Sequence, residues 1–218
     1  KQPESNHLGD CPICYLPPPV HTAKSTLKHC CCKVICNGCE YANQMRELEG
    51  RLQRTCPFCR QTPLISYEEI KKNYVTRAEA NDTRATTQLG GRCMLEGDDC
   101  AAFEYYTKAA GLGDIIAHHT LATIFYRGGQ GVEKDKKKEV YHLEQAAIGG
   151  HPSEWHDLGR NEFKRFRTDR EVKHYMIAAT LGNDDSLDAL KLIYRQRQMV
   201  AATVGVGYDH SVELMKEH

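Results

Sequence analysis

Residues 11–59 read CPICYLPPPVHTAKSTLKHCCCKVICNGCEYANQMRELEGRLQRTCPFC, and this stretch holds nine of the eleven cysteines of the 218-residue chain. Six of the nine form three Cys-x-x-Cys pairs, which are Cys11/Cys14, Cys36/Cys39 and Cys56/Cys59. The remaining three, Cys30, Cys31 and Cys32, are consecutive and lie between the first pair and the second. One such pair is a weak signal, but three pairs and a cluster within about fifty residues are typical of two zinc ions.

The number of ligands fits two ions. Zinc prefers four thiolate or imidazole ligands in a tetrahedron, and two intervening residues let one tight turn direct both sulfurs of a pair at one ion. The three pairs supply six of the eight ligands. The segment His29-Cys30-Cys31-Cys32 must therefore supply the other two.

Two other uses of the cysteines fit less well. A disulfide framework suits a secreted chain, but we expect no signal segment here, although the start at Lys1 leaves a removed segment open. A redox Cys-x-x-Cys motif needs a neighbouring βαβ pattern, which the sequence does not show. Zinc also explains folding, because residues 1–66 contain few large aliphatic side chains and so small a segment needs a staple. Structural zinc contributes about 10–16 kcal/mol in small peptides.

The order and spacing of the cysteines resemble the RING finger family over residues 11–60. The family pattern is a pair, a long loop, two central ligands, a pair, a second loop and a last pair. The resemblance implies a small α+β module in which alternate pairs share an ion. One zinc would then be held by Cys11, Cys14, Cys36 and Cys39, and the other by the central ligands with Cys56 and Cys59.

The central element departs from the family pattern. Where the family has Cys-x-His-x-x-Cys, Lys33 stands at the histidine position, and an ammonium group cannot ligate. We therefore expect an all-cysteine variant with Cys30 and Cys31 as the central ligands, since Cys31 is in register and Cys30 is the nearest thiol. Cys32 would be spare, and His29 is the alternative ligand.

A short helix is expected between the second and third pairs. Tyr41, Met45 and Leu48 recur at spacings of four and three, which predicts one apolar stripe. Gly50 is expected to end this helix. The RING family also has a helix at this place.

The resemblance carries an expected activity. RING fingers mostly act as ubiquitin ligases, which bind a ubiquitin-conjugating enzyme and accelerate transfer by positioning. It implies that Ile13 and Pro57, each between two ligands, contact the conjugating enzyme. It also implies that Arg60, directly after the last ligand, is the catalytic residue, because its planar fork of five donors suits bridging enzyme and ubiquitin. The structural alternatives are that Ile13 only packs, Pro57 only shapes a turn and Arg60 is only solvated.

The rest of the chain repeats itself. Ala-Ala-x-x-Gly occurs at residues 109–113, 146–150 and 178–182. A leucine followed by a small residue precedes each copy, as Leu89-Gly90, Leu121-Ala122 and Leu158-Gly159. Each unit is expected to form two helices; in the second unit, Asp114 would begin one helix and Asp135 the other. Stacked helix pairs can bury apolar faces that a single pair cannot.

These repeats resemble the Sel1-like repeat, a relative of the tetratricopeptide repeat. The resemblance rests on the Leu-Gly pair, the Tyr126-x-x-Gly129 element, Gly131-Val132, Asp135 and the Ala-Ala-x-x-Gly close. It implies a scaffold that binds a protein partner. His142 shares its repeat position with a tyrosine and another histidine, so we expect packing there, and the adjacent His118 and His119 point apart on a helix.

The charge composition argues against two classes of binding partner. The chain has 29 basic and 29 acidic residues and a formal net charge of zero, so no long-range field attracts nucleic acid or an anionic membrane. We expect neither as a partner, which also disfavours a nucleic-acid-binding zinc knuckle. Free thiols with zinc favour a reducing intracellular compartment, the cytoplasm or the nucleus.

The sequence thus predicts a small zinc-stabilised α+β RING finger at residues 8–62 and an all-α helical-repeat solenoid at residues 82–199, of about three and a half units. A helical linker at 63–81, begun by the capping box Ser66-x-x-Glu69, and a tail at 200–218 complete the chain. The expected function is a ubiquitin ligase with two Zn²⁺ ions. Its partners would be a ubiquitin-conjugating enzyme, ubiquitin and a protein substrate on the repeats. The alternative is a non-enzymatic, zinc-stabilised interaction scaffold.

Overall fold

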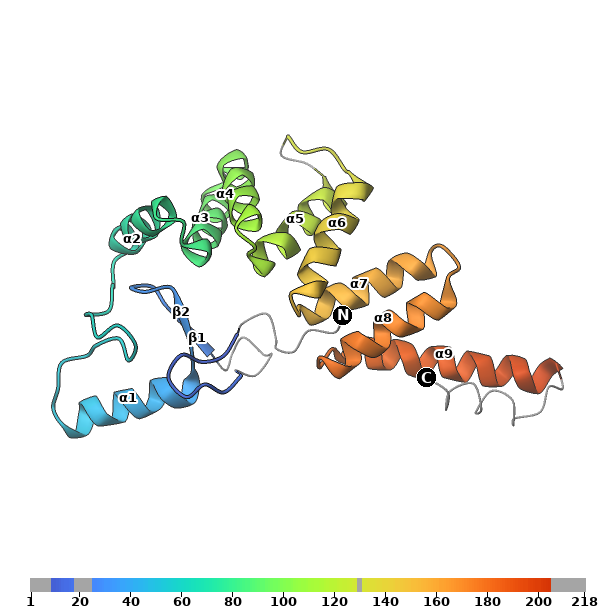
Figure 1. Ribbon diagram of the computed structural model, residues 1–218, viewed down its shortest axis with the longest axis horizontal. Coiled ribbons are helices and arrows are strands. Elements are labelled where there is room, and N and C mark those ends of the chain that lie inside the picture. The colour runs from blue at the N-terminus through green and yellow to red at the C-terminus, as the bar shows by residue number, and fades with distance from the viewer. Residues whose placement is uncertain (1–8, 18–24, 129–130, 205–218) are drawn as a thin grey trace. The chain divides into compact units, whose positions relative to one another are not determined.

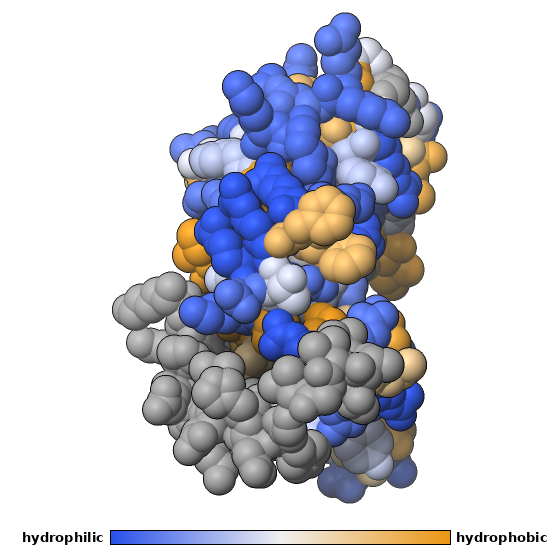
Figure 2. Space-filling view, turned by 90° about the vertical axis from the view of Figure 1, so that its right-hand side faces the viewer, coloured by the Kyte–Doolittle hydropathy of each residue, from blue (hydrophilic) through white to orange (hydrophobic). Residues whose placement is uncertain are grey.

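The computed structural model describes residues 9–17, 25–128 and 131–204, and Figure 1 shows the path of the chain. The chain divides into two compact units, Lys1–Glu154 and Trp155–His218. Within the described ranges, none of the helices is both long enough and apolar enough to cross a membrane. Hydrophilic residues cover most of the coloured surface in Figure 2, and apolar residues reach that face in small groups.

The first unit begins with a hairpin and a helix. Strands β1 (Ser25–Lys28) and β2 (Lys33–Cys36) pair antiparallel, with Ser25 opposite Cys36 and Lys28 opposite Lys33. The turn between them is residues 29–32, where the central cysteines lie. Helix α1 (Asn37–Glu49) follows β2 directly, and Gly50 ends it as expected. The Cys36 sulfur accepts a hydrogen bond from the Cys39 backbone N–H and so caps the helix.

The helix expected from Tyr41, Met45 and Leu48 is present as α1, but this apolar stripe is not its buried face. Tyr41 is 64% exposed and Leu48 72% exposed, whereas Asn43 and Glu47 are buried. The reason is that the two-stranded hairpin offers little apolar surface, its fully buried aliphatic residue being Ile35. The buried side of α1 instead forms hydrogen bonds, which are described below with the cysteines.

Five more helices follow in the first unit. They are α2 (Tyr67–Glu79), α3 (Thr83–Glu96), α4 (Asp99–Gly111), α5 (Ile115–Arg127) and α6 (Lys136–Ile148), and each contacts the next. The capping box at Ser66 and Glu69 is present at the start of α2. The expected caps Asp114 and Asp135 are confirmed, because each carboxylate accepts backbone N–H groups of its own first turn.

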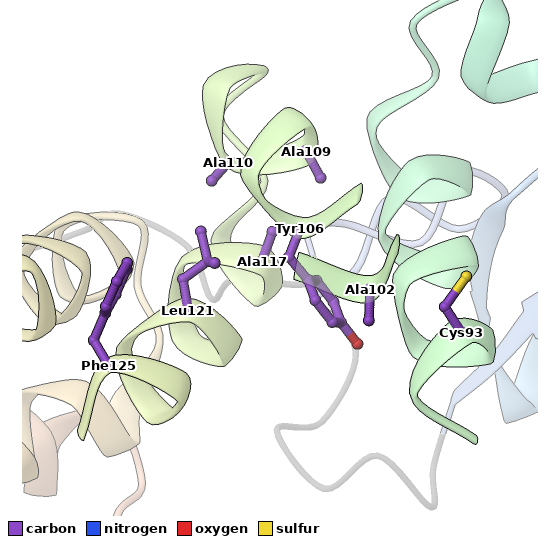
Figure 3. Packing of buried hydrophobic residues seen from close by; sticks show 8 residues of the cluster. All are labelled: Cys93, Ala102, Tyr106, Ala109, Ala110, Ala117, Leu121 and Phe125. Carbon is purple, nitrogen blue, oxygen red and sulfur yellow. The ribbon is translucent and has the colours of Figure 1, made fainter. Parts of the chain in front are cut away.

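Small residues let these helices approach closely. One core cluster joins α3, α4 and α5 and contains Cys93, Ala102, Tyr106, Ala109, Ala110, Ala117, Leu121 and Phe125 (Figure 3). The repeated alanine pair at 109–110 lies inside it. The repeated glycines Gly113, Gly150 and Gly182 have positive φ angles, which a residue without Cβ adopts freely at the end of a helix.

The second unit contains most of α7 (Pro152–Phe163), then α8 (Thr168–Thr180) and α9 (Asp184–Val204). Helices α8 and α9 contact each other, and α9 continues past residue 199, where the repeats were expected to end. Tyr175 of α8 is buried against Gly159 of α7. In the first unit, Tyr106 lies against Gly90 in the same manner.

A pair of histidines between α5 and α6 should make stability depend on pH. The Nδ1 atoms of His118 and His142 lie 2.9 Å apart, and the His142 ring stacks on Phe125. Burial, together with the neighbouring charges of His118 and Lys138, lowers the pKa of His142 to about 4. The expected packing role of His142 is confirmed.

The unfolded chain binds a proton at His142 near pH 6.5, whereas the folded chain does so only near the lowered pKa. The stability contributed by the neutral ring is therefore present above about pH 6.5 and is lost as the pH falls towards 4. We expect the urea midpoint of the wild type to fall more between pH 7 and pH 5 than that of His142→Phe, which keeps a stacked ring. The two proteins differ only at this histidine pair, so equal falls would contradict the prediction.

Candidate metal centre

The structure brings the eight predicted cysteine ligands together as two groups of four. The first group is Cys11, Cys14, Cys36 and Cys39, and the second is Cys30, Cys31, Cys56 and Cys59. Within each group the sulfur atoms all lie within 4.8 Å of one another. The two pairs of the first group are separated in sequence by two of the second group's cysteines, so the groups interleave along the chain.

The sulfur spacing suits a tetrahedral ion and excludes disulfides. Sulfur atoms are 3.8 Å apart for Cys14 and Cys36, and 3.9 Å apart for Cys31 and Cys56. A zinc–sulfur distance of about 2.3 Å places tetrahedral ligands about 3.8 Å apart, whereas a disulfide needs about 2.05 Å. All eleven cysteines are free thiols. Both groups could therefore hold a metal ion.

Two similar turns aim the outer pairs. In one, the Tyr15 N–H donates to the Cys11 carbonyl, and in the other the Arg60 N–H donates to the Cys56 carbonyl, each at 2.9 Å. Tyr15 and Arg60 both have left-handed backbones, with φ of 57° and 62°. The chain thus folds back directly after the first and the last Cys-x-x-Cys pair.

The hairpin turn separates Cys32 from the two central ligands. Cys32 has a φ of 54°, and its N–H donates to the Lys28 carbonyl at 2.8 Å. Its side chain is 3% exposed and packs with residues of α2 and α3, including Tyr74 and Leu89. The His29 Nδ1 lies 2.6 Å from the Tyr74 hydroxyl. The spare cysteine and the alternative ligand are therefore both directed to α2, away from the sulfur group.

Polar contacts from α2 hold the turn that carries the central cysteines. Asn73 donates to the His29 carbonyl at 2.6 Å, and Arg77 donates to the Cys31 carbonyl at 3.1 Å. Asn73 and Arg77 are four residues apart and so share a face of the helix. These contacts could not be predicted from the sequence, because two polar residues at helical spacing usually face water.

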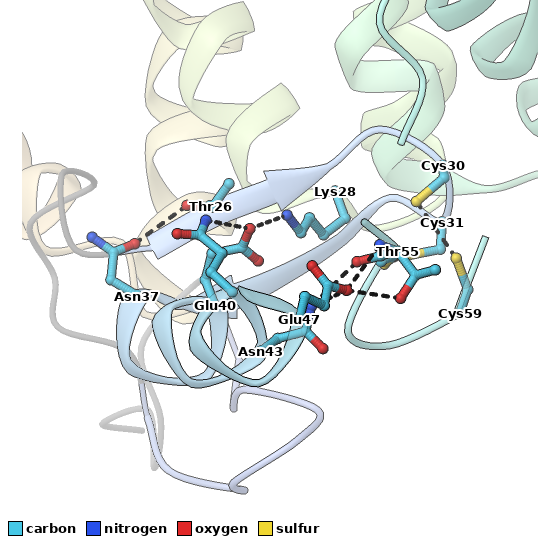
Figure 4. Close-up of polar contacts among 12 residues, drawn as sticks. Thr26, Lys28, Cys30, Cys31, Asn37, Glu40, Asn43, Glu47, Thr55 and Cys59 are labelled. Atoms are coloured by element: carbon cyan, nitrogen blue, oxygen red, sulfur yellow. Dashed lines mark hydrogen bonds and ion pairs between the residues drawn. The ribbon is translucent and has the colours of Figure 1, made fainter. Parts of the chain in front are cut away.

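Glu47 fixes the loop before the last pair (Figure 4). Its Oε1 accepts hydrogen bonds from the Thr55 N–H at 2.9 Å, the Thr55 hydroxyl at 2.9 Å and the Asn43 amide at 2.8 Å. The backbone N–H of Thr55 is the main cause that lowers the pKa of Glu47. Thr55 immediately precedes Cys56, so α1 positions the second sulfur group through a carboxylate.

Burial and crowding shift the pKa values of the thiols. Burial raises the pKa of Cys31 to about 12 and raises the pKa of Cys30 as well. Burial also opposes ionisation of Cys11, but backbone N–H groups of Cys14, Cys36 and Ile13 outweigh it and lower the pKa to about 6. Four crowded thiols resist ionising together, and a divalent cation between them favours the thiolate forms.

The three other predicted site residues lie on the two outer turns. Ile13 is 38% exposed on the first turn. Arg60 is exposed on the second turn, whereas Pro57 between the same ligands is buried. Ile13 and Arg60 thus offer side chains to a partner, and Pro57 offers little surface.

Comparisons with known proteins bear on the helical part of the chain. No family model and no curated protein matches the sequence. The crystal structure of a Sel1 repeat protein from Oxalobacter formigenes is 26% identical, with a TM-score of 0.49, over 55% of this chain and 96% of that one. The crystal structure of a protective antigen present in uropathogenic Escherichia coli strains, displaying an SLR fold, is 19% identical with a TM-score of 0.52. That match covers 71% of this chain and 32% of the antigen, and it shows that the helical repeats share the SLR fold.

Proposed function

We propose that this chain is a zinc-binding ubiquitin ligase of the RING type whose helical repeats hold a protein substrate. The observation that carries the proposal is the interleaving of the two sulfur groups. The Cys11/Cys14 and Cys36/Cys39 pairs form one group, and the central cysteines form the other with the last pair. This is the cross-brace that the RING resemblance implies. Two Zn²⁺ ions bound there would supply a rigid frame for the two outer turns.

The exposed side chains on these two turns would bind the conjugating enzyme and ubiquitin. Ile13 provides an exposed apolar contact for a ubiquitin-conjugating enzyme. Arg60 would bridge that enzyme and its ubiquitin through the guanidinium donors, holding the thioester in a reactive orientation. Since Pro57 is buried, its contribution is to shape the turn that presents Arg60. No covalent intermediate on this chain is needed.

The helical repeats would bind the protein substrate. Stacked helix pairs of the SLR fold expose side chains from successive repeats to a common partner. The contacts of Asn73 and Arg77 with the hairpin turn join the sulfur groups to α2, which in turn packs on α3. A substrate bound by the repeats of the first unit would therefore be connected to the metal frame through α2.

The test is a ubiquitin-transfer assay with a panel of conjugating enzymes and zinc-loaded protein. We expect ubiquitin chains from the wild type, a loss of more than about tenfold in rate for Arg60→Ala, and weaker conjugating-enzyme binding for Ile13→Ala. The control is Arg54→Ala, which removes another exposed arginine of the same loop. A zinc-loaded wild type that is inactive with every enzyme, or an Arg60→Ala variant as active as the wild type, would reject the proposal.

A non-enzymatic scaffold is the second candidate, and the exposed Tyr41 and Leu48 on α1 favour it. In that case these apolar side chains would form a docking surface on the zinc module. Replacing both with serine would then abolish partner binding, while Arg60→Ala would change nothing.

A further inference from the structure

A third group of ligating side chains lies in the repeats, away from the cysteines in sequence. It consists of His119 on α5, His151 in the turn after α6, and Glu154 in the first turn of α7. One nitrogen from each histidine and one carboxylate oxygen lie within 4.8 Å of one another. All three residues belong to the first unit.

The two histidines converge on a single oxygen atom. The Nδ1 atom of His119 contacts Oε1 of Glu154, and the Nδ1 atom of His151 lies 3.3 Å from the same oxygen. The two imidazole rings stack, with centroids 4.6 Å apart and an interplanar angle of 14°. Two nitrogens and one oxygen therefore lie close together, although the three residues come from three different segments.

Local structure fixes this convergence. Asp114 caps the first turn of α5 and so sets the helical position of His119. Gly150, with a φ of 88°, turns the chain after α6 and directs it into His151. The His151 carbonyl then accepts the Glu154 N–H at 3.3 Å.

Burial and charge indicate what this arrangement suits. The Glu154 side chain is fully buried, His151 is mostly buried, and His119 is 39% exposed. A buried carboxylate is costly unless a cation or several donors compensate it. Two imidazolium cations stacked at 4.6 Å would repel each other. One divalent cation compensates the carboxylate while both imidazoles stay neutral.

We infer that His119, His151 and Glu154 bind one Zn²⁺ ion. Two imidazole nitrogens and a carboxylate oxygen are ligands that zinc accepts, and three protein ligands leave a coordination position open. The ion would tie α5 to the segment that follows α6.

The test counts zinc in the full chain. Wild type, His119→Asn and Glu154→Gln proteins, each with all eight ligating cysteines, are dialysed against the same micromolar free Zn²⁺, and bound zinc is measured. We expect the wild type to hold one equivalent more than either variant, with the affinity for that equivalent falling more than about tenfold in His119→Asn. The matched control, His142→Phe, removes another histidine of the same unit and should keep the equivalent.

His119→Asn decides the question, because its partly exposed position lets the variant fold even where a change at the buried Glu154 does not. Equal zinc content and affinity in the wild type and His119→Asn would overturn the inference. Since the result is a difference between proteins with identical cysteines, it does not depend on how many ions the cysteines hold.

Discussion

Replacing Cys31 with serine is expected to release one zinc ion per chain, whereas replacing the adjacent Cys32 with alanine is expected to release none. The Cys31 sulfur belongs to the second sulfur group, 3.9 Å from that of Cys56. The Cys32 side chain packs instead among apolar residues of α2 and α3. Two neighbouring cysteines thus differ in role because the left-handed backbone at Cys32 points them in different directions.

The effect of the Cys31 change should be large. Structural zinc contributes about 10–16 kcal/mol to the folding of small modules, which exceeds what the sparse apolar core around Ile35 can replace. The measurement is zinc content by elemental analysis, with far-UV circular dichroism and limited proteolysis of the hairpin and α1. The same zinc content in both variants would contradict the assignment of the central ligands.

Replacing Gly159 with alanine is expected to destabilise the second unit, although alanine normally stabilises a helix relative to glycine by about 0.5–1 kcal/mol. A Cβ at position 159 would lie 2.6 Å and 2.8 Å from ring carbons of the buried Tyr175. Such overpacking costs about 1–3 kcal/mol. The same change at Gly90, where the Cβ would be 3.1 Å from the Tyr106 ring, should cost less.

Gly91 provides the matched control, because it neighbours Gly90 on α3 and its Cβ would meet only the Tyr106 hydroxyl at 3.5 Å. Gly91→Ala should therefore be neutral or stabilising by up to about 1 kcal/mol. Urea unfolding of the three variants, followed by far-UV circular dichroism, tests the order. A Gly159→Ala protein as stable as Gly91→Ala would show that the tyrosine moves aside.

Local signals predicted much of the helical part. Asp114 and Asp135 marked helix starts, and Gly113, Gly150 and Gly182 marked helix ends, because capping and left-handed turns depend on neighbouring residues only. The small residue after each repeated leucine could be read as a close approach, but its partner could not. The structure shows a tyrosine opposite Gly90 and Gly159. In the middle sequence repeat, Leu143 stands at the position of the tyrosine and Ala122 at the position of the glycine.

The metal-binding part was predictable only where spacing carries information. The spacing of each Cys-x-x-Cys pair predicted that its two sulfurs face one ion, since two residues set the geometry of one turn. Which pairs share an ion was predicted only by the resemblance to the RING family. Glu47 was not predictable, because its partner Thr55 lies eight residues away across a loop, and a glutamate on a short helix normally faces water. His119, His151 and Glu154 meet through three separate segments, so nothing in their local sequence indicates a site.

The most direct test of the account counts the zinc that a thiol-specific mercurial releases from freshly purified protein. Because the reagent attacks cysteine thiolates, it measures the ions held by the two sulfur groups separately from any ion on histidine. We predict two equivalents per chain, with loss of the hairpin and α1 when a strong chelator removes them. Release of fewer than two equivalents, from a protein whose N-terminal part stays folded after chelation, would contradict the account.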